Sequence, residues 1–468
     1  MTELREQVVR GVAYLVGRES LALLVSLVGV AVLVRQIGPT SYGLYAGASG
    51  IVFVVGSVGT FGLDVYLIRR LRVVTKTDLD QAVTLLVLAA AVATAATVAL
   101  VPLVLRALDE PRFVTPLRVL AASLPLTLLE APLMASLERE LNYRMVALIE
   151  MVQQFVYYGA ALTLAFLGAG VWSPVTGLIA SQAWLLVATY SAQRYRPALT
   201  WDGGLVREMV RYGTTYSVSA WLWQLRGLVN PLVVGHFLGA AAVGFVGLTA
   251  RLVEATSFVR NVAWRLSIAA FGRLQRDLPR FKRAVEEAMA LQTLSVAPLL
   301  AIIGSVGPWL LPAVFGHRWE PVVHLFPYIA IGMIFQAVFN METSALFVVD
   351  RGRSVVPVHA AHVALFVGGA TLCVWQFGVV GFGYAELIAL AAYLLLDHKV
   401  RSLFAVSYRD ALPWVAAFIP PLFALHVSAA WVPALWVPLL AVAASRRRRA
   451  QIRGYASYLR RQATAAHA

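Results

Sequence analysis

Cysteine and charged residues are both scarce in this sequence. There is one cysteine, Cys373, so no disulfide can form within the chain and the redox compartment stays undetermined. Charged residues make up 13% of the chain, whereas an ordinary soluble domain has about 25%. Hydrophobic residues make up 60%. This composition excludes a soluble protein of ordinary type and indicates a polytopic membrane protein.

Long apolar runs follow one another through most of the chain. A helix needs about 20 apolar residues to cross a bilayer, and fourteen runs near that length are present. We therefore expect an all-α integral membrane fold of 12–14 helices, with twelve as the alternative because prolines interrupt the last two runs. The expected spans are roughly 11–34, 42–67, 80–105, 117–136, 146–167, 172–192, 212–238, 241–264, 284–314, 322–349, 355–375, 378–397, 412–427 and 432–445.

Acidic residues are outnumbered by basic ones, 24 to 39, which gives a net charge of +15. With the N-terminus inside, thirty Lys and Arg fall in cytoplasmic segments, four in outer loops and five within spans. This distribution predicts a protein of the cytoplasmic membrane with both termini cytoplasmic. The basic tail, 446–468, is expected to lie on anionic lipid headgroups, and no nucleic-acid partner is expected.

An internal repeat relates the two halves of the chain. With a shift of 201 residues, Gly38 and Gly43 in LVRQIGPTSYGLYAGAS fall on Gly239 and Gly244 in VGHFLGAAAVGFVGLTA. Each pair joins the first and second helices of a half, which is typical of transporters built from duplicated bundles. The expected domains are an N-terminal bundle 1–192, a cytoplasmic linker 193–210, a C-terminal bundle 211–397, two additional membrane helices 398–445 and the tail 446–468.

Two stretches carry a resemblance to a known family. Residues 37–45 read IGPTSYGLY, and residues 230–239 read NPLVVGHFLG, with Asn230 where family members tend to have an acid. The chain resembles the polysaccharide-transporter (oligosaccharide flippase) branch of the multidrug/oligosaccharidyl-lipid/polysaccharide (MOP) superfamily. The resemblance implies two pseudo-symmetric bundles around a central cavity that opens alternately to each side. It also implies a lipid-linked oligosaccharide as cargo, an isoprenoid diphosphate carrying a glycan for the cell surface.

Arginines within the apolar spans are the candidate substrate-binding residues. A charge at the centre of a bilayer costs about 2.5–3.5 kcal/mol on insertion scales, so such residues persist for a purpose. The planar guanidinium binds diphosphate oxygens bidentately and keeps its charge. The alternatives are structural ion pairs of Arg251 with Glu254 and of Arg18 with Asp64, and interfacial anchoring of Arg260. The candidates are Arg18, Arg226, Arg251 and Arg260.

Acidic residues within spans are the candidates for ion coupling by H⁺ or Na⁺. We rank Asp64, Glu130 and Glu254 first, and structural pairing is the alternative for each. No cofactor is expected. No metal site is expected either, because His359 and His362 lack a third close ligand. The acids are Glu19, Asp64, Glu130, Glu254, Glu342 and Glu386.

Two other functions remain as alternatives. A multidrug antiporter of the same superfamily would need acids and aromatics in its cavity more than arginines. A membrane glycosyltransferase or polymerase would need a large extracytoplasmic loop, and the longest outer loop, 106–116, has about eleven residues. We therefore expect a transporter and not an enzyme, with no catalytic residues. Because two halves already complete a cavity, we expect a monomer.

Overall fold

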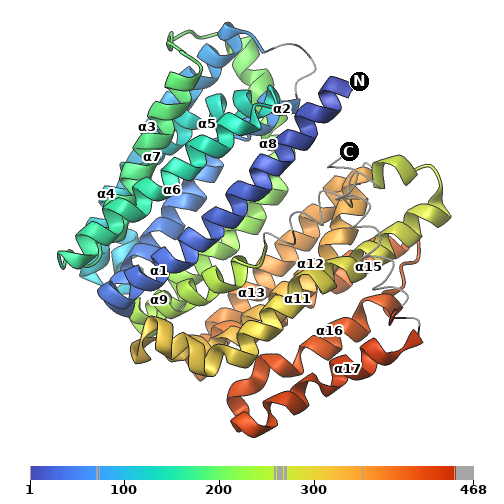
Figure 1. Ribbon diagram of the computed structural model, residues 1–468. Coiled ribbons are helices and arrows are strands. Elements are labelled where there is room, and N and C mark those ends of the chain that lie inside the picture. The colour runs from blue at the N-terminus through green and yellow to red at the C-terminus, as the bar shows by residue number, and fades with distance from the viewer. Residues whose placement is uncertain are drawn as a thin grey trace. The chain divides into compact units, whose positions relative to one another are not determined.

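A computed structural model gives the fold of residues 2–69, 72, 74–257, 260, 267, 271–349, 351–446 and 448–449, without the side chains of 2–22 and 216. The residues that it describes form helices and connecting turns and contain no strand, which confirms the all-α prediction. The chain divides into two compact units, Met1–Gly247 and Leu248–Ala468, and each unit has its own set of packed helices. Helices of both units are labelled in Figure 1.

Unit 1 contains the helices from α1 to most of α9. The elements are α1 (Thr2–Gly59), α2 (Leu63–Arg69), α3 (Lys76–Leu108), η1 (Pro111–Phe113), α4 (Val114–Ala121), α5 (Leu124–Arg139), α6 (Tyr143–Phe166), α7 (Trp172–Ala192), α8 (Gly203–Leu225), η2 (Arg226–Leu228), the π-helical turn η3 (Asn230–Val234) and α9 (Gly235–Glu254).

Unit 2 contains the end of α9 and the remaining described elements. These are α11 (Leu278–Phe315), η4 (His317–Trp319), α12 (Pro321–Val348), η5 (Gly352–Val355), α13 (Val356–Phe377), α14 (Val380–Ala389), α15 (Ala392–Arg401), η6 (Tyr408–Asp410), α16 (Leu412–Phe418), η7 (Pro420–His426), η8 (Ala429–Trp436) and α17 (Val437–Ala444).

Ten helical stretches of the described chain are long and apolar enough to cross a membrane. Two of them are kinked, one at Gly38 and one at Gly239, and each joins two helical segments at that point. The last expected pair is shorter and partly 3-10 helical, because Pro420, Pro421 and Pro433 remove N–H donors that an α-helix needs. The chain is thus a multi-pass membrane protein.

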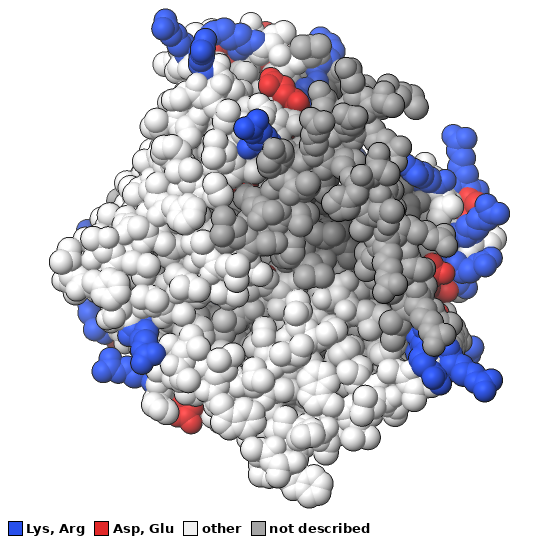
Figure 2. All heavy atoms as spheres, in the orientation of Figure 1, with Lys and Arg blue, Asp and Glu red and all other residues white. Residues whose placement is uncertain are grey.

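Charge is concentrated at the ends of the helices. On the face drawn in Figure 2, Lys and Arg side chains stand at both ends of the unit 1 helices, and uncharged residues cover the stretch between them. Four helices begin at a polar cap, whose side chain accepts from N–H groups that the first turn leaves without partners: Thr75, Asn142, Asp202 and Asp277. These caps fix the residues at which the four helices begin.

The stretch 193–202, which joins α7 to α8, is bound to the start of α3. The Asp80 carboxylate accepts from the Tyr195 hydroxyl at 2.5 Å and from the Ala198 N–H at 3.2 Å. Lys76 Nζ lies 2.6 Å from Asp80 Oδ2. Burial, followed by the Asp80 carboxylate, raises the pKa of Tyr195, so the phenol keeps its proton. The stretch is therefore folded onto unit 1.

The helix pairs of unit 1 pack closely through small residues. Helices α6 and α7 lie side by side (Figure 1), and a Cβ at Gly177 of α7 would lie 2.8 Å from the Tyr157 carbonyl oxygen of α6. Trp184 Nε1 donates to the Ile149 carbonyl oxygen at 3.1 Å. Helices surrounded by apolar lipid gain nothing from the hydrophobic effect when they associate, so close packing through small residues holds them together.

In unit 2, α12 is the central helix. It packs against α11, α14 and α15, and most of its side chains are buried. Its acid Glu342 is 0% exposed, as are Met341 and Ala345 beside it. A carboxyl group that is buried without hydrogen bonds or an ion pair costs free energy, so the groups that contact Glu342 are described further below.

Candidate functional site

The repeated turns Gly38 and Gly239 have the same backbone conformation. Gly38 has φ 75° and ψ 173°, and Gly239 has φ 77° and ψ −176°. Only glycine enters this region readily, because a Cβ would clash with the backbone. At the first turn Pro39 follows and starts the next helical segment, where its missing N–H costs nothing. A single residue thus separates the first two spans, which the sequence had placed about seven residues apart.

The helical segments that follow these turns cross at a reciprocal contact. A Cβ at Gly43 would lie 1.7 Å from the Ala240 carbonyl oxygen, and a Cβ at Gly244 would lie 2.4 Å from the Pro39 carbonyl oxygen. The shift of 201 residues carries Pro39 onto Ala240 and Gly43 onto Gly244. The contact is therefore self-complementary, as across a two-fold axis. All of it lies within unit 1.

Arg226 lies where the first helix of the second half breaks. Helix α8 ends at Leu225, and a 3-10 turn and the π-helical turn η3 precede α9. Pro231 lies inside this break and lacks the N–H of an α-helical ladder. π-Helical turns and interrupted membrane helices are frequent at binding sites. The sequence predicted Arg226 as a candidate but not the break that surrounds it.

The broken helix also presents polar groups beside Arg226. The guanidinium carbon lies 4.9 Å from the centre of the Trp223 ring, a cation–π contact that stabilises a partly buried charge. Asn230 Nδ2 donates to the Val243 carbonyl oxygen at 3.2 Å. Among the described residues, Asn230 Oδ1 and Gln224 Oε1 are buried without a hydrogen-bond partner. Trp223 and Gln224 were missed, although i, i+3 spacing from Arg226 indicates the first of them.

The other arginine candidates belong to unit 2 or lack a described side chain. Arg251 is exposed, in the last turn of α9. Arg260 is half-buried, and its Nη1 lies 3.1 Å from Met333 Sδ, while its carbonyl oxygen accepts from Gln292 Nε2 at 3.1 Å. The side chain of Arg18, in α1, lies outside the described residues. Arg226 is in unit 1, so the structure does not group these arginines within one unit.

The acid candidates differ in burial. Asp64, in the first turn of α2, and Glu254, in the last turn of α9, are exposed. Glu130, in α5, has a buried Oε2 atom with no hydrogen-bond partner among the described residues. The carboxyl groups of Glu138 and Glu150 are close enough to act on Glu130 electrostatically. Of the three ranked acids, Glu130 is the one with a buried carboxyl oxygen, whereas Asp64 and Glu254 are exposed.

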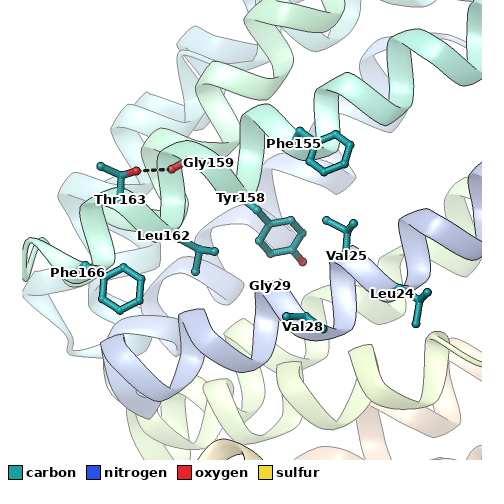
Figure 3. Close-up of a pocket in the computed structure, with 10 residues that line it drawn as sticks. All are labelled: Leu24, Val25, Val28, Gly29, Phe155, Tyr158, Gly159, Leu162, Thr163 and Phe166. Atoms are coloured by element: carbon teal, nitrogen blue, oxygen red, sulfur yellow. Dashed lines mark hydrogen bonds between the residues drawn. The ribbon is translucent and has the colours of Figure 1, made fainter.

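An apolar groove of about 630 Å³ lies between α1 and α6 in unit 1 (Figure 3). Tyr158 of α6 points toward α1 and fills the space beside Gly29, where a Cβ would lie 2.3 Å from the ring. The residues that line the groove include no arginine and no acid and are mostly apolar, so the groove offers contact chiefly for hydrocarbon. They are Leu24, Val25, Val28 and Gly29 from α1, and Phe155, Tyr158, Gly159, Leu162, Thr163 and Phe166 from α6.

Comparison with known proteins gives the family. Residues 32–324 match the family described as polysaccharide biosynthesis protein. The chain is 26% identical over 195 residues to the amylovoran biosynthesis protein AmsL of Erwinia amylovora, covering 41% of this chain and 50% of AmsL. It is 20% identical over 412 residues to the lipopolysaccharide biosynthesis protein WzxC of Escherichia coli K12, covering 87% and 84%.

Solved structures show the same fold. The lipid II flippase MurJ in an inward closed conformation matches with a TM-score of 0.70 and 12% identity, over 92% of this chain and 95% of MurJ. An inward-facing MATE multidrug transporter of the MOP superfamily matches with a TM-score of 0.64 and 14% identity, over 81% and 95%. Since the family match covers more than half of the residues, the chain belongs to the polysaccharide biosynthesis protein family.

Proposed function

We propose that this protein moves a lipid-linked oligosaccharide, an isoprenoid diphosphate bearing a glycan, across the cytoplasmic membrane for synthesis of a cell-surface polysaccharide. The match of residues 32–324 to the polysaccharide biosynthesis family carries the proposal. Relatives named for amylovoran and lipopolysaccharide biosynthesis support it. Transport follows alternating access, in which the binding residues face each side of the membrane in turn.

The arginines Arg18, Arg226, Arg251 and Arg260 are proposed to hold the cargo. A diphosphate brings negative charge and several acceptor oxygens, which suit guanidinium groups. Arg226 has the best support, because it lies on an interrupted helix beside Gln224 and Asn230, whose buried side-chain oxygens have no hydrogen-bond partner in the part of the chain that the structure describes. Hydroxyl groups of a sugar could donate to such acceptors while the diphosphate meets the cation.

Reconstitution tests this function directly. The full chain is placed in vesicles with an isoprenoid diphosphate that carries one fluorescent sugar, and a membrane-impermeant quencher reports the outer leaflet. We expect faster exchange of the lipid between leaflets than in protein-free vesicles. The same rate with and without protein would contradict the proposal.

Arg251 and Glu254 separate cargo binding from structural pairing. We expect Arg251→Ala to lose transport at normal membrane abundance, and Arg251→Lys to restore only part of it, because an ammonium keeps the charge and loses the planar fork. The double variant Arg251→Ala/Glu254→Ala stays inactive if Arg251 binds cargo. Normal transport by the double variant would assign the pair a structural role.

Orientation and assembly complete the proposal. Both termini are cytoplasmic, as the positive-inside rule predicts, and the tail 446–468 binds anionic lipid. In a Cys373→Ala background, a cysteine at position 75 stays unlabelled by an impermeant reagent in intact cells; labelling would reverse the topology. The protein acts as a monomer, so mixing active and inactive copies lowers transport only in proportion. A dominant loss would require an oligomer.

The coupling ion is proposed to be H⁺ or Na⁺. The candidates are Asp64, Glu130 and Glu254, and Glu130 has the strongest support because its Oε2 atom is buried without a partner among the described residues. Transport by Glu130→Gln that no longer responds to an ion gradient supports this role. An unchanged response would remove Glu130 from the candidates.

A further inference from the structure

A chain of hydrogen bonds in unit 2 joins the buried Glu342 to the end of α15. The Tyr408 hydroxyl contacts Glu342 Oε1, and it lies 2.7 Å from Asp397 Oδ1. Arg401 Nε lies 2.7 Å from Asp397 Oδ2 and 2.8 Å from Oδ1. Glu342 is 0% exposed, whereas the Asp397 side chain is 21% exposed. One end of this chain is therefore buried and the other is open.

The two contacts of the Tyr408 hydroxyl need more hydrogens than the phenol alone supplies. A phenol carries one hydrogen, and Tyr408 has a carboxyl oxygen on each side. Burial, followed by the Glu342 carboxylate, raises the pKa of Tyr408, so the phenol keeps that hydrogen. If both carboxyls were ionised, one of the two contacts would bring oxygen lone pairs together without a hydrogen. A second proton is needed to satisfy both contacts.

The charges around the cluster place the second proton on Glu342. Arg401 neutralises Asp397, with both carboxylate oxygens in contact. Glu342 has no described ion pair, and its Oε2 atom is buried without a hydrogen-bond partner among the described residues. An ionised carboxylate without a partner is costly in such a place, and a protonated one is tolerated.

Other ionisable groups of unit 2 lie on the elements around α12, and most of them have contacts of their own. On α11, Glu286 accepts from the Ser407 N–H at 2.8 Å and pairs with Lys282. On α14, Glu386 lies beside Gly332, ten residues and about 15 Å along the helix from Glu342. On η5, Arg353 is exposed. On α13, His362 lies against the Tyr393 ring, with centroids 5.7 Å apart.

We propose that Glu342, Tyr408 and Asp397 form a proton-binding site in unit 2. With the proton bound, Glu342 O–H donates to the Tyr408 oxygen and Tyr408 O–H donates to Asp397. On release, the Glu342 proton passes to Tyr408, the Tyr408 proton passes to Asp397, and Asp397 gives one proton to water. The hydrogen that Tyr408 receives from Glu342 already lies between the two groups, so the Tyr408 hydroxyl now donates to the Glu342 carboxylate. One proton leaves, and the phenol is unchanged.

As a coupling device, this site rests on the proposed transport function, and it names the proton as the coupling ion. The proton-binding step itself does not depend on the cargo, so it is tested separately. Infrared spectra of the purified full chain are recorded across a pH series to follow the carbonyl band of protonated carboxylic acids. Three variants are compared with the unmodified chain: Glu342→Gln, Tyr408→Phe and the control Glu386→Gln, a second buried acid of unit 2.

Beside the titration of the other carboxyls, which all four proteins share, we expect one further carboxyl band that is absent from Glu342→Gln, present in Glu386→Gln, and shifted in midpoint in Tyr408→Phe. Spectra of Glu342→Gln that titrate like those of the unmodified chain, with no band lost, overturn the proposal. If Glu342→Gln does not accumulate, Tyr408→Phe decides, since it removes one hydroxyl and nothing else: an unshifted midpoint overturns the site.

Vesicle transport then tests coupling. A pH gradient should stimulate lipid movement by the unmodified chain and by Glu386→Gln, and it should not stimulate Tyr408→Phe. Equal stimulation of all three rejects coupling through this site. Absence of lipid movement in every protein, with the infrared band still present, would reject the proposed function and leave the proton site intact.

Discussion

The two repeated glycine turns share a backbone, but the helices that lead into them differ. Gly38 and Gly239 have φ and ψ values within about ten degrees of each other. The helix before Gly38 is continuous over its described course, whereas the one before Gly239 breaks at Arg226–Leu228 and Asn230–Val234. Pro231 corresponds to Val30 under the shift of 201 residues. One proline therefore accounts for the break in the second copy.

The side chains at these positions show where the copies have diverged. Val25 and Gly29 line the apolar groove, and the same shift carries them onto Arg226 and Asn230. The first copy thus presents hydrocarbon, and the second presents a cation and an amide. A duplicated scaffold keeps its turns because they depend on backbone fit, while the exposed faces of its helices are free to acquire different chemistry.

Filling the helix crossing is expected to have the largest effect. Gly43→Ala and Gly244→Ala each place a Cβ against a backbone carbonyl, at 1.7 Å and 2.4 Å. A backbone carbonyl cannot move away as a flexible side chain can, so we expect each variant to lose about 3 kcal/mol or more of its free energy of unfolding. The loss should be larger for Gly43→Ala. Thermal unfolding of the purified variants measures this. Near-normal stability in either variant would show that the reciprocal contact does not hold unit 1 together.

Replacing Arg226 with the residue of the first copy comes next. Arg226→Val should reduce lipid transport roughly 10- to 150-fold at normal abundance, since hydrogen bonds to charged groups contribute about 1.5–3 kcal/mol. The exposed Arg118 of α4 is the matched control, and Arg118→Val should transport normally. Equal transport by both variants would mean that the divergence at Arg226 does not serve the cargo.

Alanine at either of the two positive-φ glycines should reduce stability by a similar amount, and by less than alanine at the helix crossing. Nothing lies within 4 Å of a Cβ built on Gly38 or Gly239, so Gly38→Ala and Gly239→Ala suffer backbone strain without a clash. We expect each to lose about 1–3 kcal/mol of stability. A difference of more than about 1 kcal/mol between the two, measured by denaturant titration with one detergent, would break the equivalence of the copies.

The smallest effect is expected for Asn230→Ala. The change removes the hydrogen bond to the Val243 carbonyl oxygen, and a typical hydrogen bond contributes about 0.5–1.5 kcal/mol. Since the first copy has glycine at this position, its fold needs no such bond. Thermal unfolding should therefore change little, while transport falls if Asn230 contacts the cargo. A large loss of stability would make Asn230 a structural residue of the break.

Much of the fold could be predicted from apolar runs, glycines and charge. The spans, the repeat through Gly38 and Gly239, and the family all follow from local pattern. The contact of Gly43 with Ala240 could not be predicted, because it depends on how two helices cross. The link from Tyr408 to Glu342 joins residues 66 apart through a connecting segment that has no periodic pattern. Arg226 was identified because an intramembrane charge stands out in any sequence.

The bound stretch 193–202 limits where the chain can be altered. Connecting segments usually accept inserted tags, because little depends on their backbone. In this protein the N–H groups of Ala198, Thr200 and Asp202 donate to side chains of α3, so an insertion in the stretch 193–202 would break these hydrogen bonds. At Gly168 nothing lies within 4 Å of a built Cβ, and the N–H groups described for this turn bond only to the end of α6, so it is the better place for an epitope or a fluorophore. Reporter fusions that follow this protein in living cells should be designed accordingly.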